Sequence, residues 1–426
     1  MSRFLGIQNV NTATIFKNVA ALGFVQVTNY LLPLLTLPYI IQKVGIENFG
    51  KISIAQAIIL YLVIIPDYGF NFTTTAEVVK SKNNINQLSG VVANTLVAKA
   101  FLLIVAFVLL LVASTFSFVR SEASLFFWGF SIVIGQTFFP MWFFQGIEKM
   151  KLIALLNLGS RILLTILIFF LIHEEGDYTR VLPIYGFSNL VGSIVALTIV
   201  YFKFKLKLRL PNFDEIKDNL KNGFPIFISS LANNAFVNSG LIILGYFAGP
   251  TQSGYYAIVD KVALIFRQLI VIVGQALYPS LRRLKHDSEH EIYGTVRDTF
   301  KPVLLAGVLS FILLLLIPKL IVFIFVGESI TELEHLIRII SPLPIFLIGS
   351  MLLNQLLLVY DFRTESMKAY VFCAAVSICI NIVLAYYWQS WGVAINVIAS
   401  EILLIGLFFY FIKTKEIFGS LNGRHD

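Results

Sequence analysis

The sequence predicts an all-α integral membrane protein with twelve transmembrane helices. Its 426 residues are 58% hydrophobic and only 13% charged, whereas about 25% of an ordinary soluble domain is charged. Apolar runs long enough to cross about 30 Å of hydrocarbon recur along the whole chain. A transmembrane barrel would show alternating segments of roughly ten residues instead, and the sequence lacks them.

The membrane spans and the loop charges predict the orientation of the chain. We expect spans at about 18–42, 50–71, 88–114, 122–145, 152–172, 181–202, 222–248, 253–281, 299–326, 336–360, 368–388 and 391–412. This even number places both termini on one side, whose loops hold 22 of the 32 lysines and arginines, against 5 in the opposite loops. Because cytoplasmic loops are rich in these residues, both termini are predicted to be cytoplasmic. No cleavable signal is evident, so the first span would direct insertion.

An internal repeat predicts two lobes. The sequence pattern of residues 17–71 recurs 204 positions later, and the two copies align without a gap. The matched pairs are Lys17-Asn18 with Lys221-Asn222, Asn29 with Asn233, Leu37 with Leu241, Gly45 with Gly249, Gly50 with Gly254 and Ile54 with Ile258. Chance similarity between two apolar hairpins is the alternative, but the aligned hinge glycines argue against it. Many transporters build two lobes around one central site from such repeats. We therefore expect six-helix lobes at 1–202 and 222–426.

The segment 203–221 between the lobes is basic and then amphipathic. We expect it to be a cytoplasmic linker that lies along the anionic headgroups. No loop is large enough to form a separate catalytic domain, and no phosphate-binding G-x-x-x-x-G-K-[ST] loop occurs. Cys373 and Cys379 have no metal-ligand spacing and are expected to be small buried hydrophobic residues. The net charge of +8 sits in loops between spans, which disfavours a nucleic-acid partner. The sequence does not predict an enzyme.

Charged residues inside the spans are the strongest functional signal. Lys99, Arg161, Lys261 and Arg267 lie within predicted spans, as do Asp260 and Glu401, and Asp67 lies near the end of one. A charge at mid-bilayer costs at least about 2.5–3.5 kcal/mol, so each marks a functional hypothesis. One interpretation is that each cation neutralises a carboxylate such as Asp67, Asp260 or Glu401. Asp260 and Arg267 share a helix face, but a separation of seven residues is expected to be too long for a direct bridge.

The alternative interpretation is a water-filled, positively charged cavity shared between the lobes. Such a cavity would suit an anionic substrate. Its polar walls, which could hydrogen-bond sugar hydroxyls, would include Gln26, Asn29, Asn94, Asn233, Asn234 and Asn238. Kinking prolines in the first span, Pro33 and Pro38, also favour a position beside protein or water over a position in lipid.

Four motifs in the first third of the chain resemble the lipid-linked oligosaccharide flippases. They are LLPLLTLPYI (31–40), GIENFGKISIAQA (45–57), PDYGFNFTTTAEVV (66–79) and WFFQGIEKMK (142–151). These flippases are the O-antigen and polysaccharide exporters of the superfamily that also contains multidrug extruders and lipid II flippases. The later stretches 233–262 and QALYPSL (275–281) match more loosely.

The resemblance implies a V of two lobes about a pseudo-two-fold axis, with a central cavity and alternating access. It implies that undecaprenyl-diphosphate-linked oligosaccharide is moved from the cytoplasmic to the outer leaflet of a bacterial inner membrane, for O-antigen, lipopolysaccharide or another surface polysaccharide. The expected contacts to phosphate or acidic sugar are Lys99, Arg161, Lys261 and Arg267, with Asn29 and Asn233 as further substrate-binding residues. The residues expected to couple an ion, or to pair structurally, are Asp67, Asp260 and Glu401.

Several points stay open at the level of sequence. The first span has no carboxylate, which leaves open whether the coupling ion is a proton or sodium, and no other cofactor is expected. Expected partners are the bilayer, the lipid-linked glycan, a polysaccharide polymerase and a chain-length regulator, with the chain itself a monomer. A cation-coupled drug exporter would favour an acidic cavity, a membrane glycosyltransferase would need a large catalytic loop, and a scaffold would have no lumen.

Overall fold

The computed structural model describes residues 12–207, 209–287 and 289–415, and these residues are almost entirely helical, without a strand. Within them the side chains of residues 12–31, 33–34, 275–276, 278–280 and 283–300 are not described. Seven helical segments of the described part are long and apolar enough to cross a membrane, or up to eight if the bent pair 301–316 and Pro318–Val326 is one span. The expectation of an all-helical membrane protein is therefore confirmed.

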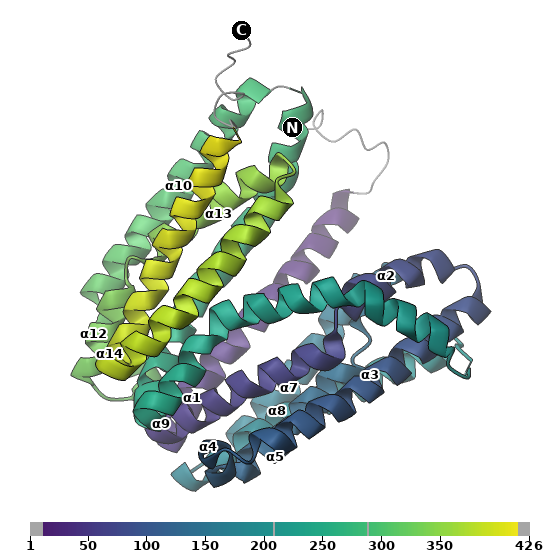
Figure 1. The fold of residues 1–426 in the computed structure, drawn as a ribbon, viewed down its shortest axis with the longest axis horizontal. Coiled ribbons are helices and arrows are strands. Elements are labelled where there is room, and N and C mark those ends of the chain that lie inside the picture. Colours follow the sequence, from purple (N-terminus) through teal and green to yellow (C-terminus); the bar gives the residue numbers. More distant parts are fainter. Residues whose placement is uncertain (1–11, 208, 288, 416–426) are drawn as a thin grey trace. The chain divides into compact units, whose positions relative to one another are not determined.

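The helices follow one another with short connections (Figure 1). The first half contains α1 (Thr12–Asp67), α2 (Phe70–Ser81), α3 (Ile85–Ala113), α4 (Ser117–Ser121), α5 (Ala123–Phe138), α6 (Met141–Gly146), α7 (Met150–Leu171), the 3-10 turn η1 (Glu175–Asp177), α8 (Tyr178–Thr198) and the π-helical turn η2 (Ile199–Lys203). The second half contains α9 (Phe213–Asp287), α10 (Glu289–Leu316), α11 (Pro318–Val326), α12 (Thr331–Ile340), α13 (Leu343–Val359) and α14 (Arg363–Thr414).

Three of these helices are too long to be single spans, and each contains one non-helical residue. The breaks are at Gly45 in α1, Gly249 in α9 and Gln389 in α14. Each lies at a boundary that the sequence predicted between consecutive spans. Gly45 (φ 78°, ψ 164°) and Gly249 (φ 79°, ψ −177°) also adopt nearly the same backbone conformation. That region of φ/ψ space is essentially restricted to glycine, so the repeat carries the same hinge at matched positions.

The chain divides into two compact units, and the first contains the described residues up to Val44 together with Ile59–Ile228. Its central pair is α5 and α8, whose backbones come close because Gly186 faces Ser131 and Gly135 faces Asn189. Apolar side chains on α3 and α7, such as Phe101 and Phe170, point away from this core and are exposed. This pattern is expected for helices that face lipid.

The segment 203–221 packs against the first unit through a row of hydrogen bonds to α2 and α3. The backbone N–H groups of Lys207 and Asn212 donate to Ser89 Oγ (3.0 Å) and Asn94 Oδ1 (2.8 Å). Asn94 Nδ2 donates to Glu215 Oε2 at 2.6 Å, and Asn219 Nδ2 donates to Glu77 Oε2 at 3.1 Å. Asn94, which the sequence suggested as a cavity wall, thus anchors this segment instead.

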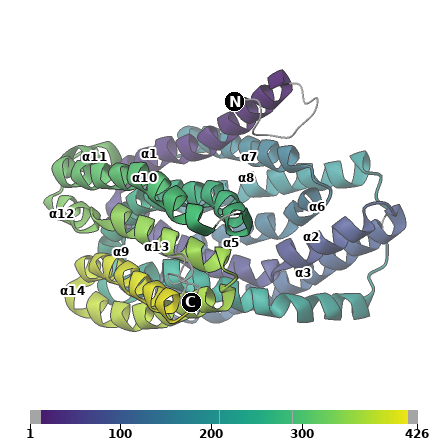
Figure 2. The ribbon, with the colours of Figure 1, turned by 90° about the horizontal axis from the view of Figure 1, so that it is seen from above.

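The second unit contains Gly45–Ile58 and the described residues from Ser229 onward. Within it α13 packs along α14, α10 along α13, and α12 against α14 (Figure 2). The segment after Gly45 packs against α9 through its glycines: Gly50 touches the backbone of Pro250, and Gly254 touches that of Ile46.

Candidate functional site: a polar cavity in the second unit

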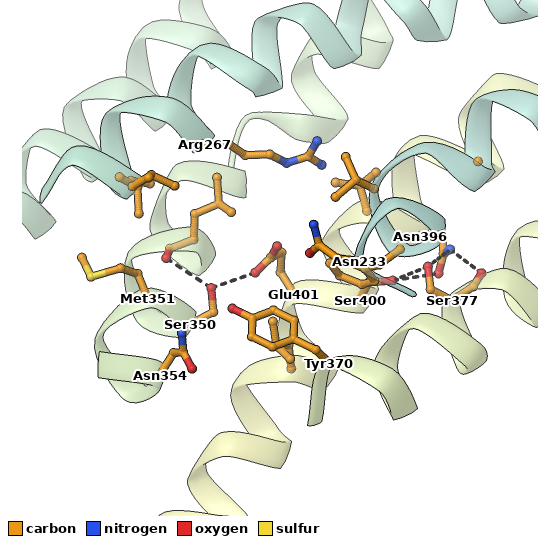
Figure 3. A pocket seen from close by; sticks show the side chains of 18 of the residues that line it. Asn233, Arg267, Ser350, Met351, Asn354, Tyr370, Ser377, Asn396, Ser400 and Glu401 are labelled. Carbon is orange, nitrogen blue, oxygen red and sulfur yellow. Dashed lines mark hydrogen bonds between the residues drawn. The ribbon is translucent and has the colours of Figure 1, made fainter. Parts of the chain in front are cut away.

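A cavity of about 360 Å³ lies among α9, α13 and α14 in the second unit (Figure 3). Sites for small molecules in proteins usually measure about 300–1,000 Å³, so this one is large enough for a ligand. Its lining includes two charged side chains, Arg267 and Glu401. The uncharged polar side chains of the lining are Asn233, Tyr256, Ser350, Asn354, Gln355, Tyr370, Ser377, Asn381, Asn396 and Ser400.

The fold of α14 positions one wall of the cavity. The chain turns at Gln389, and Gly392 lets the second half of α14 approach the backbone of Leu384 in the first half. The two halves are then joined by buried hydrogen bonds. Asn396 Nδ2 donates to the carbonyl oxygen and to Oγ of Ser377, both at 3.0 Å, and Ser400 Oγ donates to Ser377 Oγ at 3.0 Å. This network holds polar groups rigidly inside an apolar bundle.

Glu401 lies on the same wall and is only 6% exposed. It accepts a hydrogen bond from Ser350 Oγ of α13 at 2.8 Å. The carbonyl oxygen of the preceding residue, Ser400, accepts a hydrogen bond from Cys373 Sγ at 3.3 Å. Cys373 and Cys379 are both free. Cys373 is buried as expected, whereas Cys379 is exposed, so the expectation of a buried residue is wrong for Cys379.

Arg267 enters the cavity from α9 and forms an ion pair with Asp260 of the same helix. Its Nη1 lies 3.2 Å from Asp260 Oδ1. The expectation that seven residues are too far apart for a direct bridge is therefore wrong. Two helical turns separate the two Cα atoms by about 10 Å, but the long arginine side chain extends along the helix surface and spans that distance.

Lys99 and Asp67 form another ion pair, which lies in the first unit. Lys99 is 2% exposed, its Nζ lies 3.8 Å from Asp67 Oδ1, and it donates to the carbonyl oxygen of Thr137 at 3.3 Å. Asn71 Nδ2 also donates to Asp67 Oδ1, at 2.6 Å. Of the two interpretations offered by the sequence, this geometry favours neutralisation of a carboxylate for Lys99.

The remaining candidates are more dispersed. Arg161 is half-buried midway along α7 in the first unit, and Lys261 is half-buried on α9 in the second. Asn233 lines the cavity with Arg267 and Glu401. Asn29 lies in α1, outside the residues whose side chains the structure describes. The structure thus brings Arg267, Glu401 and Asn233 together in one site.

The sequence analysis missed most of the uncharged polar residues of the cavity. Ser377 and Asn381 are four residues apart on α14, and so are Asn396 and Ser400. Residues four apart share a helix face. Paired small polar residues at this spacing, in two consecutive apolar spans, were the signal that could have identified this wall.

Comparison with known proteins relates this sequence to polysaccharide biosynthesis proteins. Residues 15–285 match the family described as polysaccharide biosynthesis protein. A putative O-antigen transporter of Escherichia coli K12 is 28% identical over 414 residues, which cover 96% of this chain and 99% of the relative. A putative O-antigen transporter of Shigella dysenteriae is 25% identical over 398 residues, with 91% and 98% covered.

Solved structures of two transporter classes share the fold. An inward-facing multidrug resistance MATE family transporter of the MOP superfamily aligns with a TM-score of 0.75 at 12% identity, over 93% of this chain and 96% of the other. The lipid II flippase MurJ in an inward closed conformation aligns with a TM-score of 0.71 at 14% identity, over 92% and 87%. At these identities the similarity establishes the fold alone.

Proposed function

This chain belongs to the polysaccharide biosynthesis protein family, and we propose that it is a flippase for undecaprenyl-diphosphate-linked oligosaccharide repeat units. It moves them from the cytoplasmic to the outer leaflet of a bacterial inner membrane, where they supply O-antigen, capsule or another surface polysaccharide. The observation that carries this proposal is a polar, charge-bearing cavity inside an apolar helical bundle, in a chain that matches two putative O-antigen transporters over almost their whole length.

The proposed mechanism is alternating access by twelve helices in two six-helix lobes. The diphosphate cannot cross hydrocarbon unaided, and fixed cations in a hydrated passage would replace its solvation. Arg161 and Lys261 are the better candidates for phosphate contact, because both are half-buried within apolar helices. Lys99 and Arg267 form ion pairs with Asp67 and Asp260. The polyprenyl tail would stay in lipid throughout.

A coupling ion would drive the cycle, and Glu401 is the strongest candidate to respond to it. Its carboxylate is buried, faces the cavity and is bonded to a neutral hydroxyl of Ser350. Asp67 and Asp260 are secondary candidates, since each has a cationic neighbour. A proton and sodium remain alternatives. The protein would act as a monomer that delivers its product to a polymerase and a chain-length regulator.

Deletion of the gene tests the flippase function directly. In a strain that makes the matching polymer, we expect lipid-linked repeat units to accumulate on the cytoplasmic leaflet, where lectin or periodate detects them in everted vesicles only. The plasmid-borne wild type should restore the surface polymer. The double variant Arg161→Gln/Lys261→Gln should reach the membrane in normal amount and restore little.

Lys319→Gln is the matched control, because Lys319 is an exposed cation at the start of α11 and its loss should leave transport intact. The second candidate function is a cation-coupled drug exporter, which the carboxylate Glu401 in a cavity of this size favours. An unchanged surface polymer combined with raised susceptibility to cationic drugs in the deletion strain would replace the flippase by that exporter.

A further inference from the structure

We propose that the cavity of the second unit binds the sugar portion of the cargo, as a polyhydroxylated ring, and that it does not bind the diphosphate. This inference rests on the proposed function and assigns a substrate class to one site within it. Three observations support it: the charge of the lining, an unpartnered buried amide, and the size and aromatic content of the cavity.

The charge of the lining argues against an anion. Arg267 and Glu401 are its two charged residues, and their formal charges cancel. The guanidinium of Arg267 also forms an ion pair with the carboxylate of Asp260, with 3.2 Å between Nη1 and Oδ1. A diphosphate would therefore meet no uncompensated cation here and would be placed beside Glu401, which an apolar surrounding makes costly.

The buried side-chain amide of Asn381 indicates that the site lacks a hydrogen-bond donor, which a ligand could supply. Its side chain is 5% exposed and lines the cavity, and its Oδ1 has no hydrogen-bond partner among the described residues. A buried polar atom without a partner costs about 1–3 kcal/mol. A hydroxyl group can donate to Oδ1, whereas an ionised phosphate oxygen can only accept. The orphaned oxygen thus favours a ligand that is rich in hydroxyl groups.

Size and shape then select a ring over a small ion. The volume of about 360 Å³ is roughly twelve times the share of one water molecule in the liquid, so a bare cation would leave it nearly empty. Phe236, Tyr256 and Tyr370 contribute aromatic rings to the lining. Tyr370 packs against Phe408 with ring centroids 5.5 Å apart, which fixes its orientation. A sugar ring offers apolar C–H faces for such rings and hydroxyls for the amides.

Protection of an introduced cysteine from labelling tests the site in the full-length protein. The reporter is Val237→Cys, in a Cys373→Ala/Cys379→Ala background that still complements the deletion strain. Val237 lines the cavity and is 37% exposed, so a maleimide can reach it. The probes are the oligosaccharide released from the host's lipid-linked repeat units by mild acid, inorganic pyrophosphate, and sodium chloride.

We expect the oligosaccharide to slow labelling in a saturable manner, and pyrophosphate at equal concentration to leave the rate unchanged. Protection by pyrophosphate would identify a phosphate site, and protection by sodium alone would identify an ion site. Either result, or an oligosaccharide that never slows labelling, overturns the proposal.

Two variants connect protection to particular groups. Asn381→Leu removes the orphaned amide and should weaken oligosaccharide protection roughly three- to tenfold, the effect of one hydrogen bond. Because Asn381 is buried and this variant could fail to fold, Tyr370→Phe serves as a second one that keeps the aromatic ring and loses only the hydroxyl. Gln268→Leu changes an exposed residue next to Arg267 that lies outside the lining, and it should leave protection unchanged.

The labelling assay and the deletion strain fail independently. If the deletion strain shows no trapped repeat units but the oligosaccharide protects, the flippase function is wrong and the sugar subsite stands. If repeat units are trapped and no protection occurs, the flippase function stands and the subsite is wrong.

Discussion

A buried lysine is stable only when its charge is compensated. Lys99 is 2% exposed, and its polar contacts include the carboxylate of Asp67 and the carbonyl oxygen of Thr137. Loss of one partner from a fully buried ion pair costs about 3–5 kcal/mol. The side chain of Asp67 is 36% exposed, so solvent screening reduces this value. These residues therefore contribute to stability mainly as a pair.

A double-mutant cycle tests this pairing. Lys99→Met should destabilise the protein by about 2 kcal/mol, because it leaves the Asp67 carboxylate without its counter-charge. Lys99→Met/Asp67→Asn should recover most of that loss, because no charge remains to be compensated. Thermal unfolding of the detergent-purified protein measures both. A Lys99→Met protein of normal stability that cannot restore surface polymer would instead identify Lys99 as a substrate contact.

The sequence could predict which charged residues lie within apolar helices, but it could not predict their partners. Lys99 and Asp67 are on different helices, and their contact depends on how α1 and α3 are rotated about their axes. Asp260 and Arg267 share one helix, and there the error concerned a side-chain conformation, which residue spacing does not determine. Both carboxylates were named as candidate partners, and each was found beside one cation.

At the scale of elements, the repeat is visible as a reciprocal contact between two hinge segments. A β-carbon on Gly50 would overlap the carbonyl oxygen of Pro250, and one on Gly254 would overlap that of Ile46. Gly254 is the repeat partner of Gly50, and Pro250 is that of Ile46, so one contact is the image of the other. This close approach requires a residue without a side chain at both positions.

The reciprocity predicts matched effects of substitution. Gly50→Ala and Gly254→Ala should each destabilise the protein, by about 1–3 kcal/mol, because the added carbon is forced against backbone atoms. Gly159→Ala on α7 should stabilise it slightly, because a β-carbon there meets nothing within 4 Å and alanine favours the helix. Thermal midpoints of the three purified variants provide the comparison. Unequal effects at positions 50 and 254 would contradict the symmetry of the contact.

At this scale, the breaks within long helices were easier to predict than the packing of one segment against another. Gly45 and Gly249 could be located from the sequence, because a glycine between two apolar runs marks a break with a local cause. The attachment of the segment 203–221 to α2 and α3 was not visible, since it depends on Asn94 and Glu77, which are far away in the sequence. The composition of that segment indicated only its amphipathic character.

For the whole molecule, the charge distribution specifies orientation more strongly than any single contact does. The loops on the side of both termini carry 22 lysines and arginines and the opposite loops carry 5. Because translocation of positive charge is disfavoured during insertion, the segment 203–221 should be cytoplasmic and the turn at η1 should face outward. Leu210 lies in the segment 203–221 and Gly176 lies in η1, and both residues are exposed.

Cysteine labelling in membrane vesicles tests this orientation. In the Cys373→Ala/Cys379→Ala background, a membrane-impermeant maleimide should label Gly176→Cys in right-side-out vesicles and Leu210→Cys only in everted ones. Permeabilised vesicles, in which both positions should react, provide the control for reactivity. Labelling of Leu210→Cys from the outside would reverse the topology. The cavity residues and the proposed direction of transport would then have to be reassigned together, because the leaflet that loads the cargo is defined by this orientation.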